Sequence, residues 1–372
     1  MQIHDAAAAS LAFTFGYLAS WAIVLTQRWH GRISHDSMVG AQKFHTAPTP
    51  RIGGVAILFA LAAAQAFPAS TAGLVGPMLI AAAPAFAAGL LEDLTKKVGV
   101  LQRLVATVSC GVIAWYLSGA VVRHTGIAGM DAVLAHTPAA VLFTAVAVGG
   151  MANAVNIIDG FNGLAGGVVI IMLSSLGLIA WRVGDPQLAS VCLLLAACTA
   201  GFLAVNWPSG RIFLGDGGAY LLGFLVAWVA VMLLARNPGV PAWAPLLACA
   251  YPVLEVGFSF YRKSKREGYN PCQPDRVHLH MLVHRRVVRH RLAGRAPFLQ
   301  NAMTSPFAWL FAGVTSVWAV MFAHDAWWLA VGLLLAAVAY ARVYIRLTRF
   351  RWWPASFTGV RPPRAVSRAP SR

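Results

Sequence analysis

Acidic residues are scarce in this chain. Only 12 of its 372 residues are Asp or Glu, and charged residues together make up 11%, whereas 59% are hydrophobic. With a mean hydropathy of +0.67, this composition excludes a soluble globular domain and indicates a polytopic membrane protein. We find no repeat and no separate soluble domain. We therefore expect one transmembrane domain over residues 1–345 and a basic, disordered tail over 346–372.

Cysteine is also sparse, and its five copies show no metal-binding or disulfide spacing. Four of them lie inside apolar runs and one in a basic loop, so we interpret all five as structural. They are Cys110, Cys192, Cys198, Cys249 and Cys272.

Long apolar runs dominate the rest of the sequence. A membrane-spanning helix needs about 20 apolar residues, and we count eleven candidates, which predicts an all-α fold of about eleven transmembrane helices. The second candidate is short. They cover residues 8–26, 53–68, 74–91, 101–120, 138–156, 163–181, 187–205, 214–235, 242–260, 306–323 and 326–345.

Basic residues fix the expected orientation. The first run has no basic residue before it, while Arg28 and Arg32 follow it, so we expect a first span with a periplasmic N-terminus rather than a cleavable signal. All but three (Arg123, Arg182 and Arg236) of the 29 Lys and Arg then face the cytoplasm, as does the C-terminus. The expected cytoplasmic segments are 27–52, 92–100, 157–162, 206–213, 261–305 and the tail after 345.

The net charge of +17 does not point to nucleic acid, because the basic residues lie in short loops between apolar runs. Such a pattern is explained by membrane topology and by contact with anionic lipid headgroups. Membrane lipids are therefore expected partners.

The few acids gather where apolar runs end. Glu92 and Asp93 end the third span, Asp159 follows the fifth and Asp216 opens the eighth, all on the expected cytoplasmic side. Mg²⁺ prefers oxygen ligands and is usually held by one or two carboxylates plus substrate phosphates. The alternative for each single acid is a solvated helix end. Together they predict a metal-dependent site for an anionic, phosphorylated substrate.

Amides accompany these acids. Asn153, Asn156, Asp159 and Asn162 are spaced three residues apart, which in a helix places them on one face, where they can ligate a cation or contact a nucleobase. The glycines that follow can equally serve helix packing. Phe213 lies three residues before Asp216. It is either an interfacial anchor or a surface for base stacking.

The longest loop is basic and rich in histidine. Its segment PDRVHLHMLVHRR holds Arg276, His278, His280 and His284, which favours phosphate contact over zinc binding because it has few acids. A second basic segment, HTAPTPRIGG, runs from His45 through Arg51 to the second span. Its prolines and glycines predict rigid, non-helical backbone at the membrane surface.

Five motifs occur in a familiar order: HTAPTPRIGG, GLLEDLTKK, NAVNIIDGFNGLAGG, FLGDGG and DRVHLHM. Over roughly residues 40–290 the chain resembles the polyprenyl-phosphate N-acetylhexosamine-1-phosphate transferase family. That family includes phospho-MurNAc-pentapeptide translocase and the bacterial and eukaryotic GlcNAc-1-phosphate transferases. PTPRIGG and the loop ending in HLHM are more similar to the GlcNAc-type branch.

The resemblance implies a reaction. UDP-N-acetylhexosamine, with GlcNAc as the default sugar, gives its sugar-1-phosphate to undecaprenyl phosphate and releases UMP, with Mg²⁺ (or Mn²⁺) as cofactor. It implies the bacterial inner membrane, an active site on the cytoplasmic face, and the first membrane step of a cell-surface polysaccharide pathway such as that of lipopolysaccharide O-antigen. Relatives suggest a homodimer. The sequence names neither the sugar nor the pathway.

The resemblance also implies roles for single residues, carried over by position. It makes Asp216 the metal ligand, with Asn156 as the second. The implied catalytic group is Glu92, Asp93, Asp159 and His278, with Glu92 and Asp93 near the lipid phosphate. The implied substrate-binding residues are Asn162 and Phe213 for uracil, Arg103 for the diphosphate, Arg276 and His280 in the closing loop, and His45 and Arg51.

Three residues depart from the family pattern. Glu92 replaces the first of two aspartates, Asn162 stands where many bacterial members have Asp, and Met281 stands where many have a further His. The first departure weakens the assignment of a catalytic base. The second removes one acid.

Two other functions fit parts of the sequence. A secondary transporter would suit Glu255, an acid inside an apolar run, but the other acids sit at one membrane face rather than at the midplane. A CDP-alcohol phosphotransferase would need several acids with an Ala-Arg pair in one helix-loop stretch, and this chain lacks that signature.

Overall fold

The computed structural model describes residues 3–35, 48–67, 70–265 and 277–349. Within these ranges the fold is helical, without a strand, which confirms the predicted all-α class. The helices are α1 (Ile3–Ser34), α2 (Gly53–Ala64), α3 (Ala72–Thr95), α4 (Val100–Ser118), α5 (Ala128–Leu134), α6 (Thr137–Ile158), α7 (Leu164–Arg182), α8 (Pro186–Asn206), α9 (Gly215–Arg236), α10 (Trp243–Ala248), α11 (Ala250–Ser264), α12 (Leu279–Val283), the π-helical turn η1 (His284–Val288), α13 (Arg289–Arg291), α14 (Pro297–Ala302), α15 (Ser305–Met321) and α16 (Ala326–Thr348).

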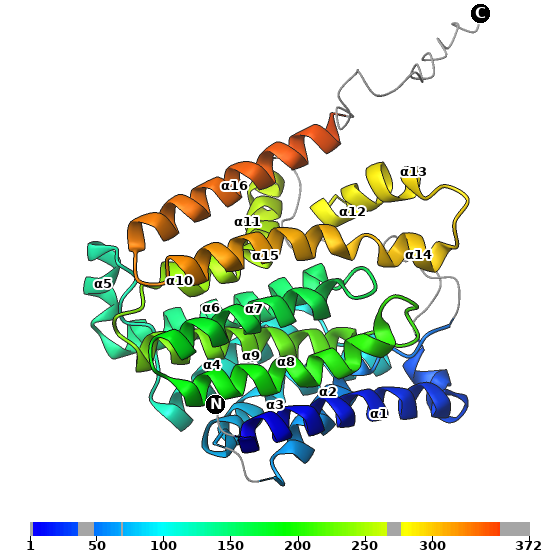
Figure 1. Cartoon of the computed structure of the whole chain (residues 1–372), viewed down its shortest axis with the longest axis horizontal. Helices are drawn as coiled ribbons and strands as arrows, with labels where there is room; N and C mark the ends of the chain where they lie inside the picture. The colour runs from blue at the N-terminus through cyan, green and yellow to red at the C-terminus, as the bar shows by residue number, and fades with distance from the viewer. Residues whose placement is uncertain (1–2, 36–47, 68–69, 266–276, 350–372) are drawn as a thin grey trace, which may run out of the picture.

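The long helices run side by side as a bundle (Figure 1). In the described part of the chain, nine helices are long and apolar enough to cross a membrane. They coincide with nine of the eleven predicted spans: α1, α3, α4, α6, α7, α8, α9, α14 together with α15, and α16. The coarse prediction of a polytopic helical membrane protein therefore holds.

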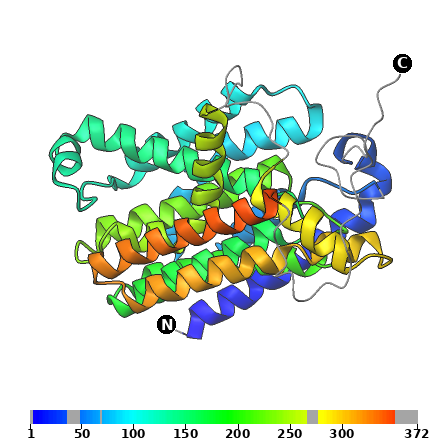
Figure 2. The ribbon, with the colours of Figure 1, turned by 90° about the horizontal axis from the view of Figure 1, so that it is seen from above.

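The other two predicted spans have unusual shapes. The segment predicted at 53–68 is the 12-residue helix α2, and the one predicted at 242–260 is divided into α10 and α11 at Cys249. Pro252 has no N–H to donate to the Ala248 carbonyl four residues earlier, which explains the break. The Ser316 hydroxyl donates to that carbonyl instead, at 3.5 Å. Beyond the break, α11 leaves the direction of the bundle (Figure 2).

Helix α9 is the centre of the bundle. It packs against α2, α3, α4, α6, α7 and α8, and almost every residue from Gly215 to Leu233 is buried. A helix that is apolar on all sides belongs in such a position. Two glycines allow close approach to it, because a Cβ on Gly54 or Gly89 would lie within 2.4–2.5 Å of backbone atoms of Gly218 and Gly217.

The two ends of the bundle differ. Helix α5 lies at one end, and α12, α13 and α14 lie at the other (Figure 1). At the α5 end, Arg236 terminates α9 and pairs with Asp185, the N-cap of α8, at 2.7 Å between Nε and Oδ2. The remaining predicted motifs meet at the opposite end, where the site described next is built.

Candidate active site at one end of the bundle

Asp216 stands in the first turn of α9 and is the centre of a charged cluster. Its Oδ1 accepts from the Nδ2 of Asn156 at 3.1 Å and from the Arg51 guanidinium, and its Oδ2 accepts from Arg103. The side chain is only 7% exposed. Four segments far apart in sequence thus converge on one carboxylate: the chain before α2, and helices α4, α6 and α9. A nearly buried carboxylate needs such compensation.

Asp93, near the end of α3, binds the beginning of α9. Its Oδ1 accepts from the backbone N–H of Asp216 and its Oδ2 from that of Gly217, both at 3.0 Å. Arg51 Nε lies 3.3 Å from Oδ1. A carboxylate at a helix N-terminus satisfies free N–H groups and interacts favourably with the helix dipole. Asp93 therefore holds Asp216 in place and lies within the same cluster.

Glycine is required at position 215 between these two acids. Its φ is +77°, and a Cβ there would lie 2.5 Å from Asp93 Oδ2 and 2.4 Å from the Arg51 carbonyl oxygen. Both the left-handed backbone and the close contact exclude a side chain. The motif FLGDGG is thus explained by the local geometry.

Arg51 is fixed by its backbone neighbours. The segment around it pairs with the segment before α9: Phe213 N donates to Pro50 O at 2.8 Å, and Gly53 N to Phe213 O at 2.9 Å. Arg51 N donates to Ser34 O at 2.8 Å. Pro48 and Pro50 keep the stretch before Ile52 out of a helix, whereas the two glycines, predicted to be non-helical, open α2. The PTPRIGG and FLGDGG motifs therefore form one unit, and half-buried Phe213 lies in it.

Glu92 points away from this cluster. Its Oε2 accepts from Val98 N at 2.9 Å in the turn between α3 and α4. Asn153 likewise bonds elsewhere, with its Nδ2 donating to Thr107 Oγ1 at 3.0 Å. Asp159 is the C-cap of α6, and its N–H donates to Asn156 O at 3.2 Å. Asn156, on the same helix as Asn153, donates directly to the Asp216 carboxylate.

Asn162 is buried in the turn between α6 and α7. Its N–H donates to Asn301 Oδ1 at 2.7 Å, its carbonyl accepts from Ser305 Oγ at 2.6 Å, and its Nδ2 donates to Pro208 O at 3.1 Å. These bonds tie the turn to α14, α15 and the loop after α8. Sequence reasoning missed Asn301 and Ser305, because nothing in their spacing distinguishes them.

The histidine segment folds against that turn. His278 and His280 are both buried, and His280 meets the Phe161 ring edge-on at 5.9 Å between centroids. Their Nδ1 atoms lie 3.1 and 3.5 Å from the carboxylate of Glu255 in α11. Sequence reasoning assigned Glu255 only to the transporter alternative. The signal that could have found this pair is a lone acid in an apolar run and a nearby histidine-rich segment.

His284 follows in the π-helical turn η1. Its Nδ1 lies 2.9 Å from Thr304 Oγ1. Burial, reinforced by the positive charges of Arg289 and Arg285, lowers the pKa of His284 to about 4. The imidazole is therefore neutral at ordinary pH. The predicted site residues His45 and Arg276 lie outside the described residues.

The side chains around Asp216 fit part of a Mg²⁺ site. In the described ranges, no three His, Cys, Asp or Glu side chains are placed to hold a metal ion by themselves. Mg²⁺ does not need such a group, since it is commonly held by one or two carboxylates with substrate phosphates and water. The Asp216 carboxylate and the adjacent Asn156 amide fit that partial role, while Arg51 and Arg103 suit the phosphates.

Comparison with known proteins identifies the family of this chain. Residues 75–234, from α3 to α9, match the family described as glycosyl transferase family 4. The chain is 30% identical over 285 residues to the decaprenyl-phosphate N-acetylglucosaminephosphotransferase of Mycobacterium tuberculosis, covering 66% of this chain and 69% of that protein. This chain belongs to glycosyl transferase family 4. The predicted resemblance is thereby confirmed.

Other relatives of this chain carry similar names. The decaprenyl-phosphate N-acetylglucosaminephosphotransferase of Mycolicibacterium smegmatis is 28% identical over 301 residues, 71% of each chain. The undecaprenyl-phosphate alpha-N-acetylglucosaminyl 1-phosphate transferase of Escherichia coli K12 is 33% identical over 154 residues, 40% of this chain and 41% of that one. The part of this chain that matches the family, residues 75–234, contains Asp93, Asn156 and Asp216.

Proposed function

We propose that this protein transfers N-acetylglucosamine-1-phosphate from UDP-N-acetylglucosamine to a polyprenyl phosphate and releases UMP. The observation that carries the proposal is the Asp216 cluster, in which Asn156, Arg51 and Arg103 contact one carboxylate at the end of a membrane bundle. Membership of glycosyl transferase family 4 and the names of its relatives support the same reaction.

The chemistry needs positioning and charge neutralisation more than covalent help. An oxygen of the lipid phosphate attacks the β-phosphorus of the UDP-sugar. The bond from that phosphorus to the bridging oxygen breaks, and UMP leaves. The second pKa of a phosphomonoester is about 6, so the attacking phosphate is already a dianion near pH 7 and needs little help from a base. Arg51 and Arg103 are placed to bind the phosphates.

Mg²⁺ bound at Asp216 and Asn156 would supply further neutralisation of the diphosphate. In this assignment Asp93 orients Asp216 through the two backbone N–H groups it binds. His280 would contact phosphates from the side of the turn after α6, which it approaches, together with the neighbouring His278.

An apolar cavity supports the lipid acceptor. It has a volume of about 560 Å³ and is lined by α6, α9, α10 and α11, among them Met151, Ala154, Val231, Val253 and Gly257. Its lining also includes Ile127 and Met130 at the α5 end of the bundle, and along α6 it reaches Ala154. In this proposal an isoprenoid chain would lie in the cavity, with its phosphate directed along α6 toward Asn156 and Asp216. We place the site at the cytoplasmic face, where the sugar nucleotide is found.

The proposal is tested with purified protein in detergent or nanodiscs. Mg²⁺, undecaprenyl or decaprenyl phosphate, and a panel of UDP-sugars are supplied, UMP is quantified, and the lipid product is identified by mass. We expect UDP-GlcNAc to give a lipid diphosphate-sugar. Release of UMP that does not depend on the polyprenyl phosphate, or no release with any UDP-sugar, would refute the assignment.

A further inference from the structure

Glu255 is an acid in an apolar helix for which the reaction above has no direct use. It is 1% exposed. Its Oε1 accepts from the backbone N–H of Leu279 at 2.8 Å and lies 3.1 Å from His278 Nδ1, and its Oε2 lies 3.5 Å from His280 Nδ1. One carboxylate thus contacts both histidines and the peptide group between them.

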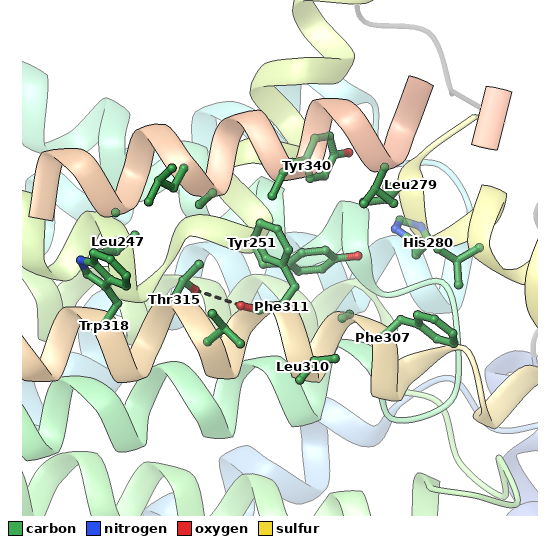
Figure 3. A pocket seen from close by; sticks show the side chains of 18 of the residues that line it. Leu247, Tyr251, Leu279, His280, Phe307, Leu310, Phe311, Thr315, Trp318 and Tyr340 are labelled. Atoms are coloured by element: carbon green, nitrogen blue, oxygen red, sulfur yellow. Dashed lines mark hydrogen bonds between the residues drawn. The ribbon is translucent and has the colours of Figure 1, made fainter. Parts of the chain in front are cut away.

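Glu255 and the two histidines meet in apolar, largely water-free surroundings. An apolar cavity of about 450 Å³ between α15 and α16 ends at His280 (Figure 3). The hydroxyl groups of Tyr251 and Tyr340 point toward the same end of the cavity (Figure 3), and both side chains lie next to Glu255. In the described part of the chain, the titratable groups that face Glu255 from α11, α16 and the segment before η1 are these two tyrosines and two histidines. Charges interact strongly where water is excluded.

The geometry also indicates which ring nitrogen of each histidine faces Glu255: His278 Nδ1 is within hydrogen-bond distance, whereas His280 Nδ1 lies 3.5 Å away without a hydrogen bond. With Nδ1 of each histidine directed at Glu255, the Nε2 atoms point away from it. His280 Nε2 lies toward the turn between α6 and α7, since a Cβ on Gly160 would be 3.4 Å from it. A carboxylate that binds one ring nitrogen sets the tautomer and the orientation of the other.

We propose that Glu255 is a positioning residue, which orients His278 and His280 and directs their Nε2 atoms to the phosphates during transfer. This inference rests on the proposed function. It assigns Glu255, on the far side of the two histidines from the turn after α6, to the same site as Asp216. The acid is thereby explained without transport.

The test compares purified Glu255→Gln, Glu255→Asp and His278→Ala/His280→Ala proteins with the unmodified enzyme. We expect Glu255→Gln to lower kcat about ten- to hundredfold, as when the carboxylate partner of a functional histidine is removed. The KM for UDP-GlcNAc should change by less than about threefold. Glu255→Asp should recover part of kcat. Adding Glu255→Gln to the double histidine variant should cost little more, because residues that act as a unit are not additive.

Two readouts separate positioning from folding. Burial lowers the pKa of His280 and the Glu255 carboxylate opposes that shift, so the limb of the pH–kcat profile due to His280 should move to lower pH in Glu255→Gln. Asp5→Asn is the matched control: Asp5 is a buried acid, 5% exposed, that bonds Ser70 and Ser190. This variant should lower the thermal unfolding temperature without moving that limb.

Nitrogen chemical shifts of labelled histidines give an answer without turnover. In the unmodified protein the Nδ1 atoms of His278 and His280 should carry the proton, and Glu255→Gln should change their shifts. Altered shifts with no UMP release from the unmodified enzyme would contradict the proposed function alone. Unchanged shifts with an unchanged pH profile, or full additivity with the histidine variants, would overturn the role of Glu255.

Discussion

The Asp216 carboxylate shares three neighbours between its two oxygens, and its replacement is the sharpest test at the residue scale. We expect Asp216→Asn to lower kcat by at least about a hundredfold, because it removes the proposed metal ligand and the charge that holds Arg51 and Arg103. UMP release by the purified variant measures this. For the unmodified enzyme, chelation of Mg²⁺ should abolish turnover and added Mg²⁺ or Mn²⁺ should restore it.

A control for that variant is Asp325→Asn, which changes an exposed N-cap of α16 at the other end of the bundle. It should keep near-normal turnover. Substantial turnover by Asp216→Asn, or activity in the presence of a chelator, would contradict the metal assignment.

Phe213 tests nucleotide binding separately from chemistry. Its backbone is fixed by Pro50 and Gly53, and its side chain is half-buried beside the site. Stacking of a base on an aromatic ring contributes about 1–3 kcal/mol, and about 1.4 kcal/mol is tenfold in binding. Phe213→Ala should therefore raise the KM for the UDP-sugar about ten- to hundredfold and leave that for the polyprenyl phosphate nearly constant.

If Phe213 is only an interfacial anchor, Phe213→Leu would keep the KM and Phe213→Ala would mainly lower stability. An unchanged UDP-sugar KM in Phe213→Ala would argue against stacking, without affecting the reaction class.

His284 predicts a pH dependence of stability. Its pKa is lowered to about 4 in the folded protein from about 6.5 in an unfolded chain, so protonation favours unfolding. The contribution of His284 to the free energy of unfolding is therefore complete above about pH 6.5 and is lost as pH falls toward about 4. Thermal unfolding temperatures of His284→Gln should depend less on pH in that window than those of the unmodified protein. His290→Gln, at an exposed position in α13, is the control.

At the scale of elements, the approach of α3 to α9 sets the place of Asp216. A Cβ on Gly89 would lie 2.5 Å from Gly217 N and 2.6 Å from Asp216 C. Gly89→Ala should therefore separate the helices, destabilise the protein by about 1–3 kcal/mol and reduce turnover. Gly76→Ala in the same helix has no heavy atom within 4 Å of its Cβ. It should leave the unfolding temperature and kcat nearly unchanged, and equal effects of the two variants would contradict this packing.

The helices themselves were largely predictable, because an apolar run of span length leaves few alternatives to a membrane helix. The sequence analysis predicts one continuous span over 242–260 and not the break at Cys249, although Pro252 is present in the sequence. It also does not predict the hydrogen-bond partner of Glu92, which is the backbone N–H of Val98 in the next turn. Contacts such as Arg51 with Asp216 join residues 165 positions apart, and no local pattern specifies them. The family motifs indicated the participants but not their bonds.

For the whole molecule, the charge asymmetry predicts that segment 261–305 faces the cytoplasm. In a Cys272→Ser background, a cysteine replacing exposed Ala293 should resist an impermeant thiol reagent in intact cells and react after lysis. A cysteine replacing exposed Ala132 in α5, at the other end of the bundle, should react in intact cells. The reverse pattern would overturn the orientation and the cytoplasmic placement of the site.

The bonds of Asn162 have a consequence for biosynthesis. The backbone N–H and C=O of Asn162 find their partners on Asn301 and Ser305, which the ribosome adds about 140 residues later. Until then this turn has no protein partner for two backbone groups that are buried in the finished protein. The turn after α6 can thus adopt its final form only late in synthesis. A nascent chain that stops after α9 would hold Asp93, Asn156 and Asp216 yet lack a completed site.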